Sequence, residues 1–215
     1  MMNILLVMML YAVVFVGSEV AYRKLHVSFL FSRKFAHIGG SVISCMLPFF
    51  ISNMYAVIFG IIFTLIIFVS KRNHFFKGIH DTKGVSIGEV LFPLGLALSA
   101  LVVWPMSVVA YQGSCLVLGL SDGLAGYIGN MHGRRSYKVL GGTKTIEGSM
   151  IFLIFTIMIF VAYYMIYGDD ISVVGLTLLA LYAIGVTAVE AILSRGWDNL
   201  VIPVVAGLAL ILVIS

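Results

Sequence analysis

About eight apolar runs, each close to the length of about 20 residues that a helix needs to cross a membrane, constrain the fold most strongly. They lie near residues 3–22, 36–52, 53–70, 87–103, 105–131, 148–167, 171–193 and 199–215. Several runs are short, so we expect tilted helices or local thinning of the bilayer. The runs predict an all-α integral membrane protein, a bundle of about eight transmembrane helices that forms a single domain over residues 1–215.

The composition agrees with this class. Hydrophobic residues make up 61% of the chain and charged residues only 10%, whereas a soluble domain carries about 25% charged residues. Cys45 and Cys115 both lie in apolar runs, which indicates buried thiols. The first run has no basic residue before it and is followed by Arg23 and Lys24, so we interpret it as a helix and not as a cleaved signal peptide.

The basic residues mark one side of the membrane. All 13 Lys and Arg residues fall in segments 23–35, 71–86, 132–147 and 194–198. The turns between the other helix ends, at 52–53, 104–105 and 168–170, contain none. By the positive-inside rule the basic segments face the cytoplasm, so the N-terminus and the C-terminus are both expected outside. The predicted location is the cell membrane, with polar chemistry on the cytoplasmic face.

The acidic residues other than Asp169 and Asp170 gather at or near the cytoplasmic helix ends: Glu19, Asp81, Glu89, Asp122, Glu147, Glu190 and Asp198. A channel or transporter more often has ionisable groups near the middle of the bilayer. We therefore expect a pocket that faces the cytoplasm and opens sideways to lipid. His74, His80 and Asp81 fall in a polar loop and are expected to face solvent.

A glycine stripe follows Asp122 inside the fifth apolar run. On a helix over residues 105–133, Asp122, Gly126, Gly129 and Gly133 share one face. The simpler interpretation is close helix packing through small residues. The alternative is close approach of a ligand to the backbone, and the carboxylate favours it, because an Asp inside a span is costly and usually functional.

The loop after this helix is strongly basic, with Arg134, Arg135, Lys138 and Lys144. Arginine matches phosphate oxygens with two N–H groups, and lysine supplies a point charge. For charges alone, the simpler interpretation is an anchor on anionic lipid. The carboxylate of Asp122 suits a Mg²⁺ shell shared with phosphates, and this combination favours a nucleotide phosphate site.

The end of the same loop adds features suited to an anion. Gly141, Gly142 and Thr143 form a flexible turn with exposed N–H groups. Residues 145–147 open the next helix, whose N-terminus favours negative charge. The segment is not a Walker P-loop, because its lysine follows threonine and we expect no strand here.

These residues resemble the membrane superfamily of CTP-using lipid enzymes. The matching string is Asp122-Gly-x-x-Gly126-x-x-Gly129-x-x-x-Gly133, followed by Lys144-Thr-x-Glu147-Gly. The superfamily includes dolichol, phytol and farnesol kinases, a fungal CTP-dependent diacylglycerol kinase and phosphatidate cytidylyltransferase. The resemblance implies CTP and metal binding. Our nucleotide-binding candidates are Gly126, Gly129, Gly133, Arg134, Arg135, Lys138, Gly142, Thr143, Lys144, Thr145, Glu147, Arg33 and Lys34.

Two further stretches separate the branches of this superfamily. The pattern Arg33-Lys34-x-x-His37-x-x-Gly40 resembles the phytol and dolichol kinases, in which case the two cations hold phosphate. For His37 two interpretations stay open, a base and a residue of the pocket wall.

The second stretch is Glu190 followed by Asp198, Asn199 and Pro203. It also resembles the lipid-alcohol kinases, and the chain lacks the longer basic signature of the cytidylyltransferases. A tight turn would bring Glu190 and Asp198 to the pocket mouth, although a helix cap is the simpler interpretation of Asp198. Glu89 either interacts favourably with the dipole of its helix or lines the pocket. We count Asn199 and His37 among the pocket residues too.

The resulting hypothesis is a kinase that transfers the γ-phosphoryl group of CTP to a membrane isoprenoid alcohol, such as a polyprenol, phytol or geranylgeraniol. Asp122 would hold Mg²⁺ with Glu190 or Asp198, Lys144 would neutralise charge, and one of the two partner carboxylates would accept the alcohol proton. The sequence does not distinguish CTP from ATP. Expected partners are the nucleotide, the alcohol and membrane lipid, with no nucleic acid. The alternatives are a cytidylyltransferase that makes a CDP-lipid, and a small transporter or scaffold.

Overall fold

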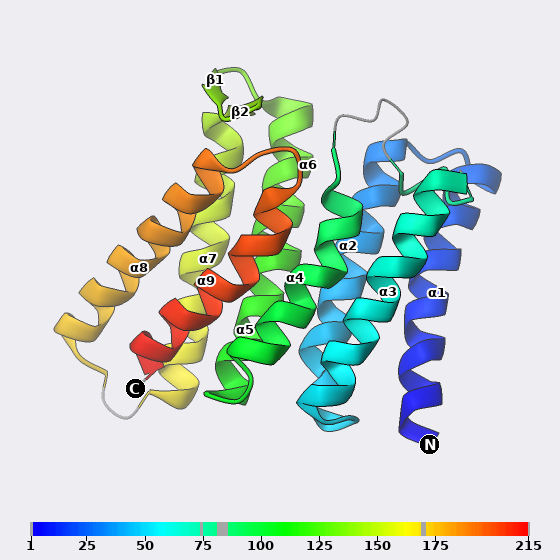
Figure 1. Ribbon diagram of the computed structural model, residues 1–215. Coiled ribbons are helices and arrows are strands. Elements are labelled where there is room, and N and C mark those ends of the chain that lie inside the picture. Colours follow the sequence, from blue (N-terminus) through cyan, green and yellow to red (C-terminus); the bar gives the residue numbers. More distant parts are fainter. Residues whose placement is uncertain (1, 74, 81–85, 169–170, 215) are drawn as a thin grey trace.

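The structure is a computed structural model, and it describes all residues except 1, 74, 81–85, 169–170 and 215. The described residues form long helices that lie side by side in one bundle (Figure 1). In chain order these are α1 (Met2–Lys24), α2 (Phe29–Met46), α3 (Asn53–Asn73), α4 (Gly88–Val102), a continuous helix made of α5 (Val108–Leu116), η2 (Val117–Asp122) and α6 (Gly123–His132), then α7 (Ile146–Tyr167), α8 (Val173–Ile192) and α9 (Trp197–Ile214). A short 3₁₀ turn, η1 (Leu47–Phe49), follows α2.

Six of these helices are long and apolar enough to cross a membrane, which makes the chain an integral membrane protein. They are α1, α3, α5–η2–α6, α7, α8 and α9. The helix α4 is apolar but shorter, and α2 carries Arg33 and Lys34 in its second turn. The predicted helical bundle is confirmed, whereas eight full spans are supported only in part.

The continuous helix α5–η2–α6 lies at the centre of the bundle. In its most apolar stretch 67% of the residues are buried, against 22% in α1, α3 and α8. Its middle section, η2, is a π-helical turn that ends on Asp122. Such π turns inside α-helices are rare and are found most often at functional sites. We expected a straight α-helix to residue 133, but Gly133 has left the helix and is extended.

A β-hairpin replaces the flexible loop that we expected between the central helix and α7. Strands β1 (Ser136–Val139) and β2 (Gly142–Thr145) pair antiparallel, with Val139 opposite Gly142. The expectation of no strand was wrong, because outside the membrane alternating Tyr, Val and Thr residues favour pairing. The tight turn needs Gly141, whose φ is +82°.

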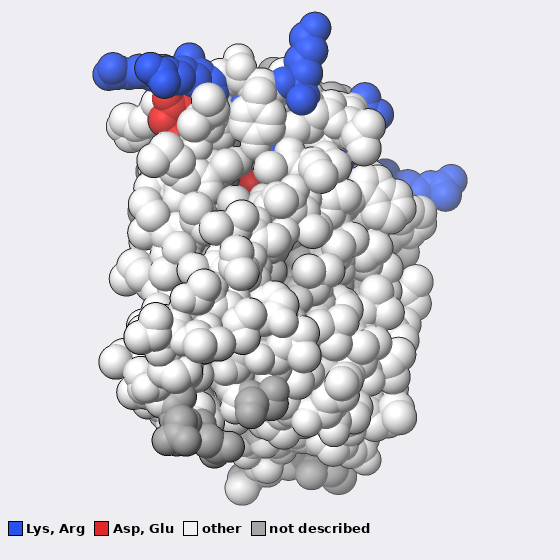
Figure 2. Space-filling view, turned by 90° about the vertical axis from the view of Figure 1, so that its left-hand side faces the viewer, with Lys and Arg blue, Asp and Glu red and all other residues white. Residues whose placement is uncertain are grey.

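The charged side chains lie mainly at the hairpin end of the bundle. Figure 2 shows Lys and Arg gathered at that end, while the rest of the visible face is almost free of charge. Both chain termini lie at the opposite end (Figure 1). The one-sided charge pattern thus holds for the described residues, and the compartment that each end faces stays a prediction. Lys83, Asp169 and Asp170, used in that prediction, lie outside the described residues.

His80 corrects one expectation about the loops. We expected it to face solvent, but it is 4% exposed and its Nε2 lies 2.9 Å from Ser70 Oγ. His80, which the sequence places in a loop, thus packs inside the bundle, because the chain after α3 folds back over α1 and α2. His74 and Asp81, which we also expected in solvent, lie outside the described residues. Cys115 is buried and Cys45 partly buried, both as free thiols.

Candidate functional site

A cavity of about 610 Å³ lies at the hairpin end of the bundle. Pockets of about 300–1,000 Å³ hold one ligand of drug or nucleotide size. Most of the predicted site residues line it, namely Arg33, Lys34, His37, Glu89, Asp122, Gly126, Gly129, Gly142, Thr143, Lys144, Thr145, Glu190, Asp198 and Asn199. The structure therefore brings together residues from α2, α4, α6, the hairpin, α8 and α9, which are far apart in the chain.

The remaining predicted residues lie outside the cavity lining: Gly133, Arg134, Arg135, Lys138 and Glu147. The three cations are exposed around the hairpin. One carboxylate oxygen of Glu147, Oε2, accepts a hydrogen bond of 3.2 Å from the backbone N–H of Arg135, so this side chain ties the base of the hairpin to α7. A role for these residues in nucleotide binding stays a prediction.

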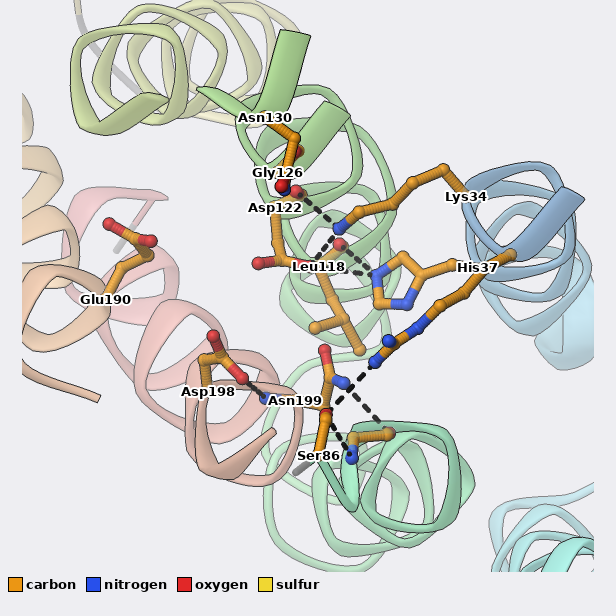
Figure 3. A network of polar contacts seen from close by, with 12 residues as sticks. Lys34, His37, Ser86, Leu118, Asp122, Gly126, Asn130, Glu190, Asp198 and Asn199 are labelled. Carbon is orange, nitrogen blue, oxygen red and sulfur yellow. Dashed lines mark hydrogen bonds and ion pairs between the residues drawn. The ribbon is translucent and has the colours of Figure 1, made fainter. Parts of the chain in front are cut away.

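Lys34, His37 and Asp122 form what we call the helix cluster, because all three side chains come from α2 and the central helix (Figure 3). Lys34 Nζ lies 3.3 Å from Asp122 Oδ2 and donates to the Asp122 carbonyl at 3.1 Å. His37 Nε2 lies 3.3 Å from the same carboxylate oxygen. With only 7% of Asp122 exposed, the lysine supplies the charge that a buried carboxylate requires.

The π turn takes part in this cluster. His37 Nε2 donates to the carbonyl of Leu118, within η2, at 2.9 Å. A carbonyl only accepts, so this contact places a proton on Nε2. The ring of His37 also packs on Phe92 of α4, with centroids 4.5 Å apart. His37 thus stands between the charged part of the cavity and an apolar wall.

Lys144, Glu190 and Asp198 form a second group, the hairpin cluster. Lys144 Nζ, on β2, makes an ion pair with Glu190 of α8 and lies 3.4 Å from Asp198 Oδ2 of α9. Ser149 Oγ donates to Glu190 Oε2 at 3.3 Å. Burial by itself lowers the pKa of Lys144, but the two carboxylates outweigh it and raise that pKa above its ordinary value. Lys144 is therefore a fixed positive charge at neutral pH.

The glycine stripe has two different roles in the structure. A methyl group on Gly129 would lie 2.7 Å from Thr145 Oγ1 and 3.3 Å from the Gly148 Cα, so this glycine packs α6 against the start of α7. A methyl group on Gly126 would instead lie 2.5 Å from Lys34 Nζ. Gly126 thus clears the path by which Lys34 reaches Asp122, a role that we had not expected from the stripe.

Arg33, Glu89 and Asn199 hold α4 to its neighbours at the cavity rim. Glu89 pairs with Lys71 Nζ at 2.8 Å and lies 3.8 Å from an Arg33 nitrogen. Arg33 also donates to Ser86 Oγ at 3.1 Å. Asn199 Nδ2, on α9, donates to the Gly88 carbonyl at 2.9 Å. These contacts fix the mouth of the cavity. Glu89 lies both at the start of its helix and in the pocket wall, so its position agrees with both interpretations.

The carboxylates of Asp122, Glu190 and Asp198 all face the cavity, and carboxylate oxygens are the ligands that Mg²⁺ prefers. Their donor chemistry therefore fits this ion. No three of the described His, Cys, Asp and Glu side chains lie close enough together to form a metal site by themselves. A lysine ammonium group contacts each of these three carboxylates. Metal binding stays a prediction, and phosphate oxygens would have to complete the coordination shell of the ion.

Several cavity residues were not predicted. Ser194 Oγ donates to the carbonyl of Leu140, and Arg195 Nε donates to that of Gly141 at 2.7 Å. Both residues lie in the turn between α8 and α9 and hold the tip of the hairpin. Gly196 follows with a φ of +99°, against the backbone of α4. The signal was present, since Ser-Arg-Gly between two apolar runs is a turn sequence.

The fold and the site define a polytopic helical membrane protein with a cationic and acidic cavity at one end. Compared with known proteins, the chain is 28% identical over 175 residues to a phytol kinase of Synechocystis sp. (strain ATCC 27184 / PCC 6803 / Kazusa), a match that covers 80% of this chain and 74% of the relative. No protein-family model and no solved structure matches. The chain is a distant homologue of that phytol kinase, which confirms the resemblance to the phytol kinases.

Proposed function

We propose that the protein is a lipid-alcohol kinase that transfers the γ-phosphoryl group of CTP to the hydroxyl of a membrane isoprenoid alcohol. The observation that carries the proposal is the pairing of Lys34 and Lys144 with three carboxylates around one cavity of nucleotide size, at the end of an apolar bundle. The similarity to a phytol kinase supports it. Phytol, geranylgeraniol and polyprenols are the alcohols that we would test first.

The chemistry needs positioning and charge stabilisation more than covalent catalysis. In this proposal Lys34 and Lys144 bind the phosphates from two sides of the cavity and offset the charge that develops on the transferred group. Asp122 and Glu190 would hold Mg²⁺, which would supply positive charge that offsets the phosphate oxygens. The hairpin residues Gly142 and Thr143 supply backbone N–H groups beside the nucleotide.

We assign the role of the base to Asp198 and not to Glu190. Glu190 is held by Lys144 and by Ser149, whereas Asp198 Oδ2 lies 3.4 Å from Lys144 Nζ. Its side chain is 15% exposed, against 6% for Glu190, so a substrate reaches it more easily. The alcohol passes its proton to Asp198, its oxygen bonds to the γ-phosphorus, and the bond to the CDP oxygen breaks.

Product analysis tests the proposal. Purified protein is incubated with Mg²⁺, with CTP, ATP, GTP or UTP, and with each alcohol in turn. We expect an alcohol monophosphate and CDP. In a parallel incubation with phosphatidic acid in place of the alcohol, a CDP-lipid with pyrophosphate would instead identify a cytidylyltransferase. Failure to bind any of these nucleotides in the presence of Mg²⁺ would favour the transporter or scaffold.

The cytoplasmic orientation needs a separate experiment. Lys138→Cys places a thiol on the exposed hairpin, and Tyr167→Cys places one at the opposite end of α7. A membrane-impermeant thiol reagent should label the second variant in intact cells and the first only after permeabilisation. The reverse pattern would place the cavity outside.

A further inference from the structure

The lining of the cavity changes character from one side to the other. The charged part holds both clusters described above, with side chains from α2, the central helix, the hairpin, α8 and α9. The apolar part consists of Phe15, Leu30, Ala36, Ile79 and Phe92, and Phe15, Ala36 and Ile79 pack together in one hydrophobic cluster. Arg33 and Glu89, on α2 and α4, are charged residues of the cavity rim. His37 lies at the border, packed on Phe92 and 3.3 Å from the Asp122 carboxylate. A ligand that spans this border needs one charged end and one hydrocarbon end.

A second, small cavity of about 30 Å³ lies deeper in the same part of the bundle, between α1, α2, α3 and α4. Its wall is almost entirely apolar and includes Phe59, Phe63, Leu96 and Phe92. Three hydroxyl side chains line it, Tyr11, Ser44 and Tyr111 of α5, and the first two are bonded to each other at 2.6 Å. None of the described residues in this lining is charged and most are apolar, so the lining suits hydrocarbon.

Phe92 separates the two cavities, because it belongs to the lining of both. Beside it Phe15, in the first lining, contacts Phe63, in the second, with ring centroids 4.8 Å apart. Phe92 is therefore the residue at which the two linings meet. Leu96 stands one helical turn further along α4, about 5.4 Å deeper, a step comparable to the length of one isoprene unit.

We propose that the apolar side of the cavity receives the hydrocarbon chain of the alcohol and that the Phe92 ring limits its length. This inference rests on the proposed kinase function and adds a specificity-determining residue to it. The hydroxyl lies on the Asp122 side of His37, and the chain runs along Ala36 towards Phe15 and Phe92. An alcohol whose chain is longer than the apolar side of the cavity is disfavoured, because the Phe92 ring blocks the second cavity.

The test compares alcohols that differ by one isoprene unit, namely geraniol, farnesol and geranylgeraniol. The readout is the ratio of kcat/KM for each longer alcohol to that for the next shorter one, within one variant. A ratio does not depend on how much of the preparation is folded. Phe92→Ala should join the two cavities and raise a ratio about tenfold in favour of the longer alcohol, the usual scale for hydrophobic pockets. Phe92→Leu should give a smaller change in the same direction.

Two further variants control for altered packing. Phe160→Ala removes the same atoms from a fully buried phenylalanine on α7 that lines neither cavity, and its ratios should equal those of the wild type. In the double variant Phe92→Ala/Leu96→Phe an aromatic ring returns one turn deeper. This variant should lose most of the gain for the longest alcohol.

The outcomes separate this inference from the proposed function. If the wild type phosphorylates none of the alcohols with any nucleotide, the kinase proposal fails. If the wild type is active but Phe92→Ala and Phe92→Leu keep its ratios, the chain of the alcohol lies elsewhere, for instance directly in the bilayer, and the inference alone is overturned. Equal changes in Phe160→Ala would overturn it too.

Discussion

The helix cluster and the hairpin cluster place similar chemistry on different scaffolds. In each, a lysine is held at the cavity by carboxylates, Lys34 by Asp122 and Lys144 by Glu190 and Asp198. Lys34 stands on a helix inside the bundle, whereas Lys144 stands on a two-stranded hairpin whose outer face is exposed. The first charge is thus placed by the packed core, and the second by a small element that can adjust. The following substitutions test this difference.

Asp122→Asn should have the largest effect, because the carboxylate organises the helix cluster and is the proposed metal ligand. We expect kcat to fall by about 10³-fold, the upper range for loss of one preorganised charged group. Steady-state kinetics with CTP and the best alcohol measure it. Glu19→Gln is the matched control. It also neutralises a buried acidic side chain at this end, but one that contacts Arg23 and lies outside the cavity lining. Activity of Asp122→Asn within tenfold of the wild type would contradict the metal role.

Loss of either lysine should cost less, about 10²-fold in kcat for Lys34→Met and for Lys144→Met. The comparison becomes sharp with arginine. Lys144→Arg should recover a large part of the activity, because the hairpin can shift to fit the longer side chain. Lys34→Arg should recover little, because the ammonium group already fills the space above Gly126. Equal recovery of activity in the two arginine variants would contradict the proposed difference between the helix and the hairpin.

The glycines of α6 provide a smaller and more specific test. Gly126→Ala should push the end of Lys34 aside and lower kcat about tenfold, since small misplacements of catalytic groups are costly. The midpoint of thermal unfolding should change little, because the crowded atoms end a flexible side chain. Gly129→Ala crowds Thr145 and the backbone at Gly148, so it should lower the unfolding midpoint. If both variants lost only stability, the stripe would serve packing alone.

The bundle itself could be predicted because hydropathy and one-sided charge act over whole helices. The position of Asp122 in the fifth apolar run and the opening of α7 at Thr145 and Glu147 followed from the same local patterns. Asp122 marked the centre of the site because a carboxylate in such a run has few structural uses. These features depend on residues close in the chain, where sequence patterns carry most information.

The contacts across the cavity could not be predicted in the same way. Lys34 and Asp122 are separated by 88 positions in the chain, and their pairing depends on how α2 packs against the central helix. The hairpin was missed because four-residue strands leave almost no periodic signal. The π turn at Val117–Asp122 was missed too, and its Leu118 carbonyl accepts a hydrogen bond from His37, a residue 81 positions away in the chain. For Gly126, the spacing showed the shared face, but only the packed structure shows which side chain crosses it.

Arg195→Ala should have the smallest effect and tests whether the hairpin depends on its support from the α8–α9 turn. The substitution removes the 2.7 Å hydrogen bond to the Gly141 carbonyl, worth about 1 kcal/mol when exposed groups are concerned. Lys144 would then be placed less firmly, so we expect KM for the nucleotide to rise severalfold with kcat nearly unchanged. Kinetics at saturating alcohol separate the two constants, and Arg72→Ala, which removes an exposed cation at the end of α3 outside the cavity lining, is the control for loss of charge. An equal rise of KM in both variants would show that net charge, and not the position of the hairpin, governs nucleotide binding.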